Sequence, residues 1–265
     1  GGQLMFEYEF MRRAFLVGLL LATIIPCIGT IIVLKRLSMM GDALSHTSLA
    51  GVAAGLLIGA NPIVGAIIVT LVAGFGIDFI RKKFPRYSEI SIAITMSAGI
   101  GLAGVLSGFT DSSTGFSSFL FGSIVAITDF ELYLVVILSI LVMLTFILLY
   151  KELRYIAFDE EGARLIGIPV KTVNFIFTIL TALTISIASR TVGTLIVSSI
   201  MVIPVACAMK LTSSYRMTII LSILFALVFT SIGLSLSFYV GLKPGGTIVL
   251  SGVLTLILLM IFKKD

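Results

Sequence analysis

ELYLVVILSILVMLTFILLY, residues 131–150, decides the fold class, because its twenty residues include a single charged side chain, Glu131. A helix needs about 20 apolar residues to cross the hydrocarbon core of a bilayer, so this segment predicts a transmembrane helix. The rest of the chain has the same character: 58% of the residues are hydrophobic, 12% are charged, and the mean hydropathy is +1.21. Soluble domains carry about 25% charged residues. The sequence therefore predicts an integral membrane protein.

Eight further apolar segments have a comparable length, and breaks that contain Gly and Pro, such as 59–62 and 243–246, separate several of them. We therefore expect an all-α integral membrane protein with about nine transmembrane helices, which form a single transmembrane domain over residues 1–265. The expected spans are residues 14–34, 41–58, 62–80, 90–108, 131–150, 172–189, 191–209, 217–240 and 245–262.

The basic residues predict the orientation, because loops on the cytoplasmic side of a membrane protein are enriched in Lys and Arg. With the N-terminus outside and the C-terminus in the cytoplasm, fourteen basic residues fall inside and four fall outside. The inside set is Lys35, Arg36, Arg81, Lys82, Lys83, Arg86, Lys151, Arg154, Arg164, Lys171, Lys210, Arg216, Lys263 and Lys264, and the outside set is Arg12, Arg13, Arg190 and Lys243. The inverted topology reverses the ratio.

Two connecting segments are long enough to form structure of their own. The outside segment 109–129 contains no Lys or Arg, and its second half is too apolar for a free loop and too short to span, so we interpret it as re-entrant or interfacial. The inside segment 151–171, KELRYIAFDEEGARLIGIPVK, is the most charged part of the chain but keeps an apolar side. It predicts a short amphipathic helix at the cytoplasmic surface, with a solvated connector as the alternative.

The candidate site lies in the second predicted span, where GDALSH, residues 41–46, contains Asp42 and the only histidine of the chain, His46. Residues four apart lie on one face of a helix. A carboxylate and an imidazole together suit zinc and manganese. Two ligands are too few for a tetrahedral site, but a twofold axis between two chains would bring together two copies of each. The alternative is structural: Asp42 caps the helix N-terminus and His46 hydrogen-bonds a neighbouring helix.

Three segments carry a resemblance to a known family. LKRLSMMGDALSHTSLAGVAAG, residues 34–55, resembles the signature of the membrane permeases of zinc- and manganese-importing ATP-binding-cassette transporters, and RTVGTLIVSSIMVIPVACAM, residues 190–209, is similar to their second apolar signature. EGARLIG, residues 161–167, resembles the E-A-A-x-x-x-G motif that such permeases present to their ATPase, although Gly162 stands where alanine is usual.

This resemblance implies the fold, the partners and the roles of the site residues. It implies a permease homodimer in a prokaryotic cell membrane, two cytoplasmic ATPase subunits, and an extracellular metal-binding lipoprotein or periplasmic solute-binding protein. Asp42 and His46 match the ligands of the transported metal, with zinc expected first and manganese second. The ATPase-coupling residues that it implies are Glu160, Glu161, Gly162, Ala163 and Gly167.

The chain contains no GxxxxGK[ST] phosphate-binding loop, so we expect a transport subunit that is not an enzyme, with ATP bound by a partner. An ion-coupled secondary cation transporter is the alternative, but such proteins more often place several carboxylates inside the membrane. An intramembrane metalloenzyme would need at least three protein ligands and a general base, which a single histidine without an HExxH motif does not provide.

Overall fold

The computed structural model describes residues 5–109 and 127–263, and this part of the chain is helical without any strand. Nine long helices correspond to the nine expected spans, with ends that differ by a few residues. They are α1 (Glu9–Leu34), α2 (Met40–Leu57), α3 (Pro62–Lys83), α4 (Ser88–Ser107), α6 (Asp129–Leu148), α9 (Val170–Val192), α10 (Thr194–Leu211), α11 (Tyr215–Val240) and α12 (Pro244–Phe262). The short helices η1 (Met5–Glu7), α7 (Tyr150–Phe158) and α8 (Glu160–Leu165) complete the described fold. The predicted all-α membrane fold is confirmed.

Seven of the nine long helices are long and apolar enough to cross a membrane by themselves, so the expected count of nine is approximate. The exceptions are α2 and α10, and for α10 this statement covers only Val197–Leu211. Thirteen of the eighteen residues of α2 are buried inside the protein. A helix that is enclosed by other helices need not be apolar all round, and α2 therefore tolerates Asp42 and His46.

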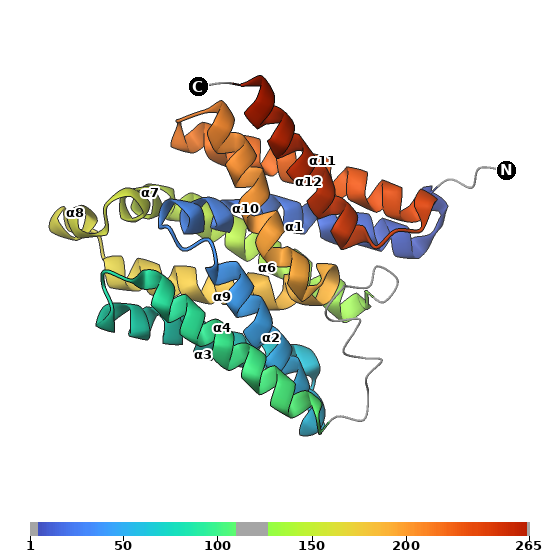
Figure 1. The fold of residues 1–265 in the computed structure, drawn as a ribbon, viewed down its shortest axis with the longest axis horizontal. Helices are drawn as coiled ribbons and strands as arrows, with labels where there is room; N and C mark the ends of the chain where they lie inside the picture. The colour runs from blue at the N-terminus through green and yellow to red at the C-terminus, as the bar shows by residue number, and fades with distance from the viewer. Residues whose placement is uncertain (1–4, 110–126, 264–265) are drawn as a thin grey trace.

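The helices form two groups, and α1 packs against α10 and α11 of the second one (Figure 1). α2, α3 and α4 pack together on one side, α10, α11 and α12 pack on the other, and α9 contacts both α3 and α10. On the outside of the second group, α12 exposes a stripe of leucines with a spacing of four residues: Leu250, Leu254 and Leu258 are 63%, 61% and 52% exposed. This stripe is the surface that lipid or another apolar helix is expected to cover.

Two glycines allow the backbones of α2 and α3 to touch. A Cβ atom at Gly51 would collide with the carbonyl oxygen of Gly65, and a Cβ atom at Gly65 would collide with the carbonyl oxygen of Gly51. Small residues at such contacts are the usual way in which membrane helices approach closely. Because the contact is backbone to backbone, a displacement of α3 is transmitted directly to α2.

The predicted amphipathic helix in 151–171 is two helices instead of one. Asp159 has an extended backbone and its carboxylate accepts a hydrogen bond of 2.9 Å from the Gly162 amide, so it ends α7 and begins α8 as the N-cap. A local side-chain bond of this kind competes with the continuous helix. The re-entrant segment that we expect at 109–129 lies for the most part outside the described residues.

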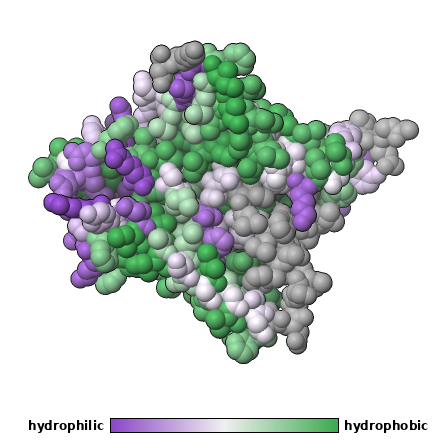
Figure 2. Space-filling view, in the orientation of Figure 1, coloured by the Kyte–Doolittle hydropathy of each residue, from purple (hydrophilic) through white to green (hydrophobic). Residues whose placement is uncertain are grey.

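Hydrophilic side chains gather at the end of the molecule that carries α7 and α8, whereas apolar side chains cover most of the middle (Figure 2). The basic residues Arg81, Lys82 and Lys83 end α3 at this same end. The structure therefore has one strongly charged end beside an apolar body, as expected for a protein that crosses a bilayer.

Candidate functional site

Asp42 and His46 lie one turn apart in α2, as their spacing predicts. His46 Nε2 is 3.8 Å from Asp42 Oδ1, and the two side chains are 22% and 25% exposed. This separation is too long for a hydrogen bond. Two ligands of a tetrahedral metal with bonds of about 2.1 Å are roughly 3.4 Å apart, so a small rotation of either side chain would let both bind one ion.

The other faces of α2 are packed, and this packing fixes where the pair points. Gly41 lies against Met201 Sδ and Ser198 of α10, because a Cβ atom at Gly41 would be 3.2 Å and 3.4 Å from them. Ser45 and Thr47 turn their hydroxyls back to carbonyls of their own helix. Asp42 and His46 are therefore the partly open polar side chains of the first half of α2.

The described residues do not show the alternative in which Asp42 caps the start of α2 and His46 hydrogen-bonds a neighbouring helix. The N-cap of α2 is Met39, which makes no side-chain cap bond, and the first helical amide, that of Met40, donates to the Leu37 carbonyl. Within residues 5–109 and 127–263, neither Asp42 nor His46 makes a hydrogen bond to a neighbouring helix. The metal-ligand role of the two residues stays a prediction.

A single chain brings together only two of the required ligands. No group of three or more His, Cys, Asp or Glu residues that could hold a metal occurs in the described part of the chain. Cys27 and Cys207, the two thiols, are both buried and free, and Cys27 donates to a carbonyl of its own helix. The remaining ligands of a transported ion must come from a second chain, from water, or from residues outside the described part.

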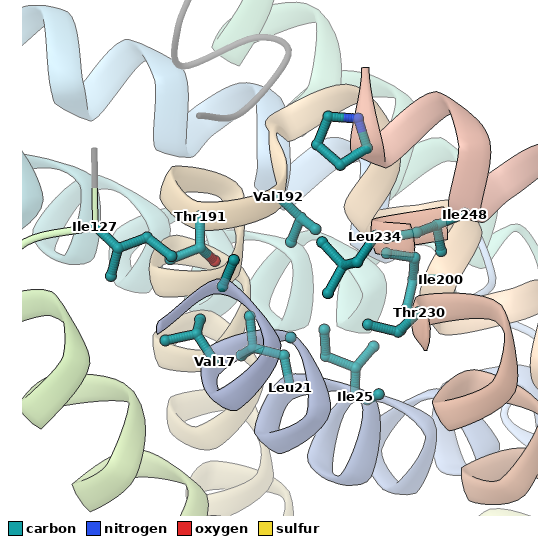
Figure 3. Close-up of a pocket in the computed structure, with 14 residues that line it drawn as sticks. Val17, Leu21, Ile25, Ile127, Thr191, Val192, Ile200, Thr230, Leu234 and Ile248 are labelled. Carbon is teal, nitrogen blue, oxygen red and sulfur yellow. The ribbon is translucent and has the colours of Figure 1, made fainter. Parts of the chain in front are cut away.

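An apolar pocket lies elsewhere, between α1, α10, α11 and α12 and the end of α9 (Figure 3). Its cavity volume is about 30 Å³, and its polar side chains are the threonines Thr191 and Thr230. It has no carboxylate, imidazole or thiol in its lining. Transition metals prefer those ligands, so this pocket is not a metal site.

The residues of the coupling motif lie in and after α8 and divide by exposure. Ala163 is 2% exposed, whereas Leu165 and Ile166, which the motif did not single out, are 88% and 63% exposed. Gly162 lies under the Asp159 carboxylate, and a Cβ atom there would collide with Asp159 Oδ2. Glycine in the place of the usual alanine thus fits the N-cap. The exposed pair belongs to the apolar side that the sequence predicts for residues 151–171, and a membrane-surface helix and a partner-binding helix both need one.

Gly167 ends α8 with a positive φ of 89°. The Gly167 amide donates to the Arg164 carbonyl at 3.2 Å, and the Ile168 amide donates to the Ala163 carbonyl at 3.1 Å. These two bonds form a Schellman motif, in which the residue with positive φ is usually glycine. Gly167 thus provides the turn that leads the chain toward Pro169.

Sequence reasoning missed a charge cluster at the same end of the molecule, which we define as Lys35, Asp78, Arg81 and Glu160. Glu160 Oε2 is 3.9 Å from Lys35 Nζ and 3.8 Å from an Arg81 nitrogen. Asp78 is 3.7 Å from Arg81. The four residues come from three distant parts of the sequence, so no local pattern could have revealed that they meet.

Lys35, just after α1, is the most buried member of the charge cluster. Its side chain is 8% exposed, and its amine donates a hydrogen bond of 3.0 Å to Asn174. Burial, with a smaller contribution from nearby Arg81, lowers the pKa of Lys35 to about 8, although Glu160 and Asp78 act in the opposite direction. The charge of this amine is thus sensitive to pH within an accessible range.

Comparison with known proteins gives one consistent result. The family model described as the ABC 3 transport family matches residues 7–263. A "Probable metal transport system membrane protein" of Treponema pallidum is 35% identical over 97% of this chain and 96% of its own length. The "Manganese transport system membrane protein MntC" of Listeria monocytogenes is 32% identical over 97% of this chain and 91% of its own. Among solved structures, PsaBC from Streptococcus pneumoniae in complex with Fab has a TM-score of 0.86 at 28% identity, and the match covers 97% of this chain and 92% of that one.

Proposed function

The chain belongs to the ABC 3 transport family, and from this premise we propose that it carries manganese across the cell membrane through a site built from Asp42 and His46. It is the permease subunit of an ATP-binding-cassette metal importer and is not catalytic, since ATP is hydrolysed by a separate subunit. The observation that supports the proposal most directly is the pair of unlike metal ligands on one partly open face of α2.

The choice of metal rests on chemistry and on the relatives. A carboxylate and an imidazole are good ligands for both manganese and zinc. The relatives from Listeria and from Streptococcus parasanguinis are named for manganese transport, and this favours manganese over the zinc preference that the sequence suggested. Zinc remains the second candidate, because the imidazole nitrogen is a frequent zinc ligand.

The proposed assembly completes the site. Two permeases related by a twofold axis would place two copies of Asp42 and His46 around one ion, which gives four ligands where a single chain has two. Two ATPase subunits would dock at the charged end around α8, and an extracellular solute-binding protein would deliver the metal at the opposite end. This arrangement puts the N-terminus outside and the C-terminus in the cytoplasm. Closure of the ATPases would then open the pathway alternately to the two sides.

Asp42→Asn and His46→Gln test the site with little change in side-chain volume. We expect ATP-driven uptake of manganese into proteoliposomes to fall by about a hundredfold or more, because disturbing even the outer shell of a metal site costs roughly 10- to 100-fold in affinity. Co-purification with the ATPase should persist. Glu89→Gln is the matched control, since Glu89 is also an acid in the first turn of a long helix but is exposed and near the charged end.

Competition between manganese and zinc in the same vesicles tests the cargo. We expect manganese uptake to resist an equal concentration of zinc in the wild-type protein. Uptake at the wild-type level in either variant would refute the ligand assignment, and exclusive uptake of zinc would refute manganese as the cargo while leaving the metal-importer function in place.

A further inference from the structure

The two adjacent carboxylates at the start of α8 face in different directions. Glu160 is half-buried and lies within 4 Å of three cationic side chains: Lys35 at 3.9 Å, Arg81 at 3.8 Å and Arg164 at 3.6 Å. Glu161 is exposed and forms no ion pair within the part of the chain that the structure describes. The first turn of α8 therefore combines an inward-facing acid with an outward-facing one.

Lys35 and Arg81, which both contact Glu160, lie far from it in the sequence. Lys35 belongs to the connection that leads into α2, and Arg81 belongs to α3, which packs against α2. Lys35 begins the connection 35–39 between α1 and α2. The amide of Leu37 in this connection donates to the Ile32 carbonyl at 2.9 Å, and the amide of Met40 donates to the Leu37 carbonyl at 2.8 Å. Leu37 itself is 4% exposed. The connection is thus a hydrogen-bonded turn and not a flexible linker. A displacement of Lys35 is therefore expected to move the start of α2.

Arg81 provides the second route. It lies in the last turn of α3, and α3 touches α2 through the backbone contact between Gly51 and Gly65. Asp78, one turn before Arg81, accepts a hydrogen bond of 2.7 Å from Thr178 and so ties the same end of α3 to α9. Glu160 is therefore joined to α1 and α3 by charge, and both of these elements are joined to α2 by tighter contacts.

The distances between Glu160 and its cationic partners suit a contact that changes during transport. Charge-assisted hydrogen bonds are about 2.7–2.9 Å long, whereas the ion pairs of Glu160 measure 3.6 to 3.9 Å. The charge cluster also opens onto a recess of about 750 Å³ between α3, α8 and α9. Glu160 has room to shift relative to Lys35 and Arg81 without breaking a packed apolar interface.

We propose that Glu160 is a positioning residue that transmits the movement of α8 to α1 and α3, and through them to the Asp42 and His46 site, while Glu161 belongs to the surface that meets the ATPase. This inference rests on the proposed function, because it assumes that α8 receives the ATPase. It assigns different roles to two neighbouring acids for which the resemblance implies the same coupling role.

Glu160→Gln tests the proposal in the complete transporter of permease and ATPase subunits. We expect the variant to assemble with the ATPase and to hydrolyse ATP, but to move about tenfold less manganese per ATP, which is within the range for residues that carry coupling between distant sites. Glu161→Gln is the matched control and should keep the ratio of uptake to hydrolysis even if it weakens assembly. Arg164→Gln is a second control, because it removes only the cation on the same helix as Glu160.

Combination with Lys35→Gln separates transmission from general damage. The double variant should lose little more coupling than Glu160→Gln alone, since residues in one network are not additive. Lys35→Gln alone should cause part of the loss, because the ion pair between Glu160 and Arg81 remains, and it provides the test if Glu160→Gln does not assemble. An unchanged uptake per ATP in both single variants, weakened ATPase binding as the only defect of Glu160→Gln, or losses that multiply in the double variant would each overturn the proposal. A wild-type complex that moves no metal would instead refute the proposed function.

Discussion

Lys35 is a cation held almost out of water, and its titration has a definite sign. In the unfolded chain a lysine amine titrates near its ordinary value, whereas burial lowers the pKa of Lys35 in the folded protein to about 8. Between these two values the folded state binds fewer protons than the unfolded state. The cost of burying the charge is therefore present in full below about pH 8 and is relieved as the pH rises through that window.

Above about pH 8 the Lys35 amine loses its proton and its charge. This loss should weaken the contact of Lys35 with Glu160. The groups around the amine are Glu160 of α8, Asn174 of α9, and Asp78 and Arg81 of α3. We expect the amount of metal moved per ATP to fall as the pH rises above about 8 in the wild-type protein. In Lys35→Arg, whose guanidinium stays charged, the fall should be displaced to higher pH.

Parallel pH profiles of uptake and of ATP hydrolysis in proteoliposomes make the comparison, and their ratio cancels effects on ATPase turnover alone. Thermal unfolding of the Lys35→Arg complex checks that the larger side chain is accommodated. Identical profiles for the wild type and a folded Lys35→Arg would mean that the charge of residue 35 has no part in coupling.

For contacts between individual residues, spacing in the sequence predicted only those between residues one helical turn apart. The pairing of Asp42 with His46 follows from helical geometry, and the structure reproduces it. The contact of Glu160 with Lys35 joins residues 125 positions apart. Such a contact depends on the packing of whole helices, which hydropathy and periodicity do not specify.

Among the elements, α8 ends at a residue with an uncommon backbone conformation. Gly167 has a φ of 89°, and a Cβ atom there would meet nothing within 4 Å. A side chain at this position is therefore opposed by backbone strain and not by crowding. Residues held in such regions cost about 1–3 kcal/mol each.

Gly167→Leu should accordingly disturb the end of α8 and leave the spans in place. We expect the variant to insert normally and to retain metal at Asp42 and His46, but to co-purify poorly with its ATPase and to lose stimulated ATP hydrolysis. Gly167→Asn is the matched control, because asparagine tolerates positive φ better than other residues do. Stimulation at the wild-type level in Gly167→Leu would show that α8 is only a connector.

The elements themselves were predictable to different degrees. Helices such as α6 and α12 were predictable from their length and apolar composition, and their ends lie within two residues of the expected spans. The division of 151–171 at Asp159 was not predicted. It depends on one side chain accepting one amide hydrogen bond, and Asp occurs as readily in helices that do not break.

For the whole molecule, the sequence predicted the order and number of long helices but not which of them the others enclose. α2 carries two ionisable residues and is mostly buried, whereas α12 is mostly exposed. Both were read as equivalent spans. The difference in burial between α2 and α12 arises from tertiary packing. The mean hydropathy of a segment does not show which helices will enclose it.

The distribution of charge over the molecule supports one orientation in the membrane. α3 has 22 residues, or about 33 Å of helix, which is long enough to place its two ends on opposite sides of a bilayer. Phe84 follows α3 at the charged end, and Ala60 precedes it in the exposed turn at the other. Tyr155 in α7 lies at the charged end and is 54% exposed.

Cysteine substitutions at these positions test the orientation with an impermeant thiol reagent applied to intact cells. The native Cys27 and Cys207 are both buried, which keeps the background low. If the charged end is cytoplasmic, Phe84→Cys and Tyr155→Cys should be protected and should react only after the membrane is made permeable. Ala60→Cys should react at once, and so should Ser113→Cys, at a position outside the described residues.

The conclusion on membrane orientation requires the labelling results of all four cysteine variants together. Protection of a single position can result from burial against a partner, whereas Phe84 and Tyr155 lie in separate elements, so their joint protection points to the membrane as the common barrier. Labelling of both from outside, with Ala60→Cys protected, would invert the topology. The ATPase would then have no access to α8, and coupling would have to run through the connection between α2 and α3 or the ends of other spans.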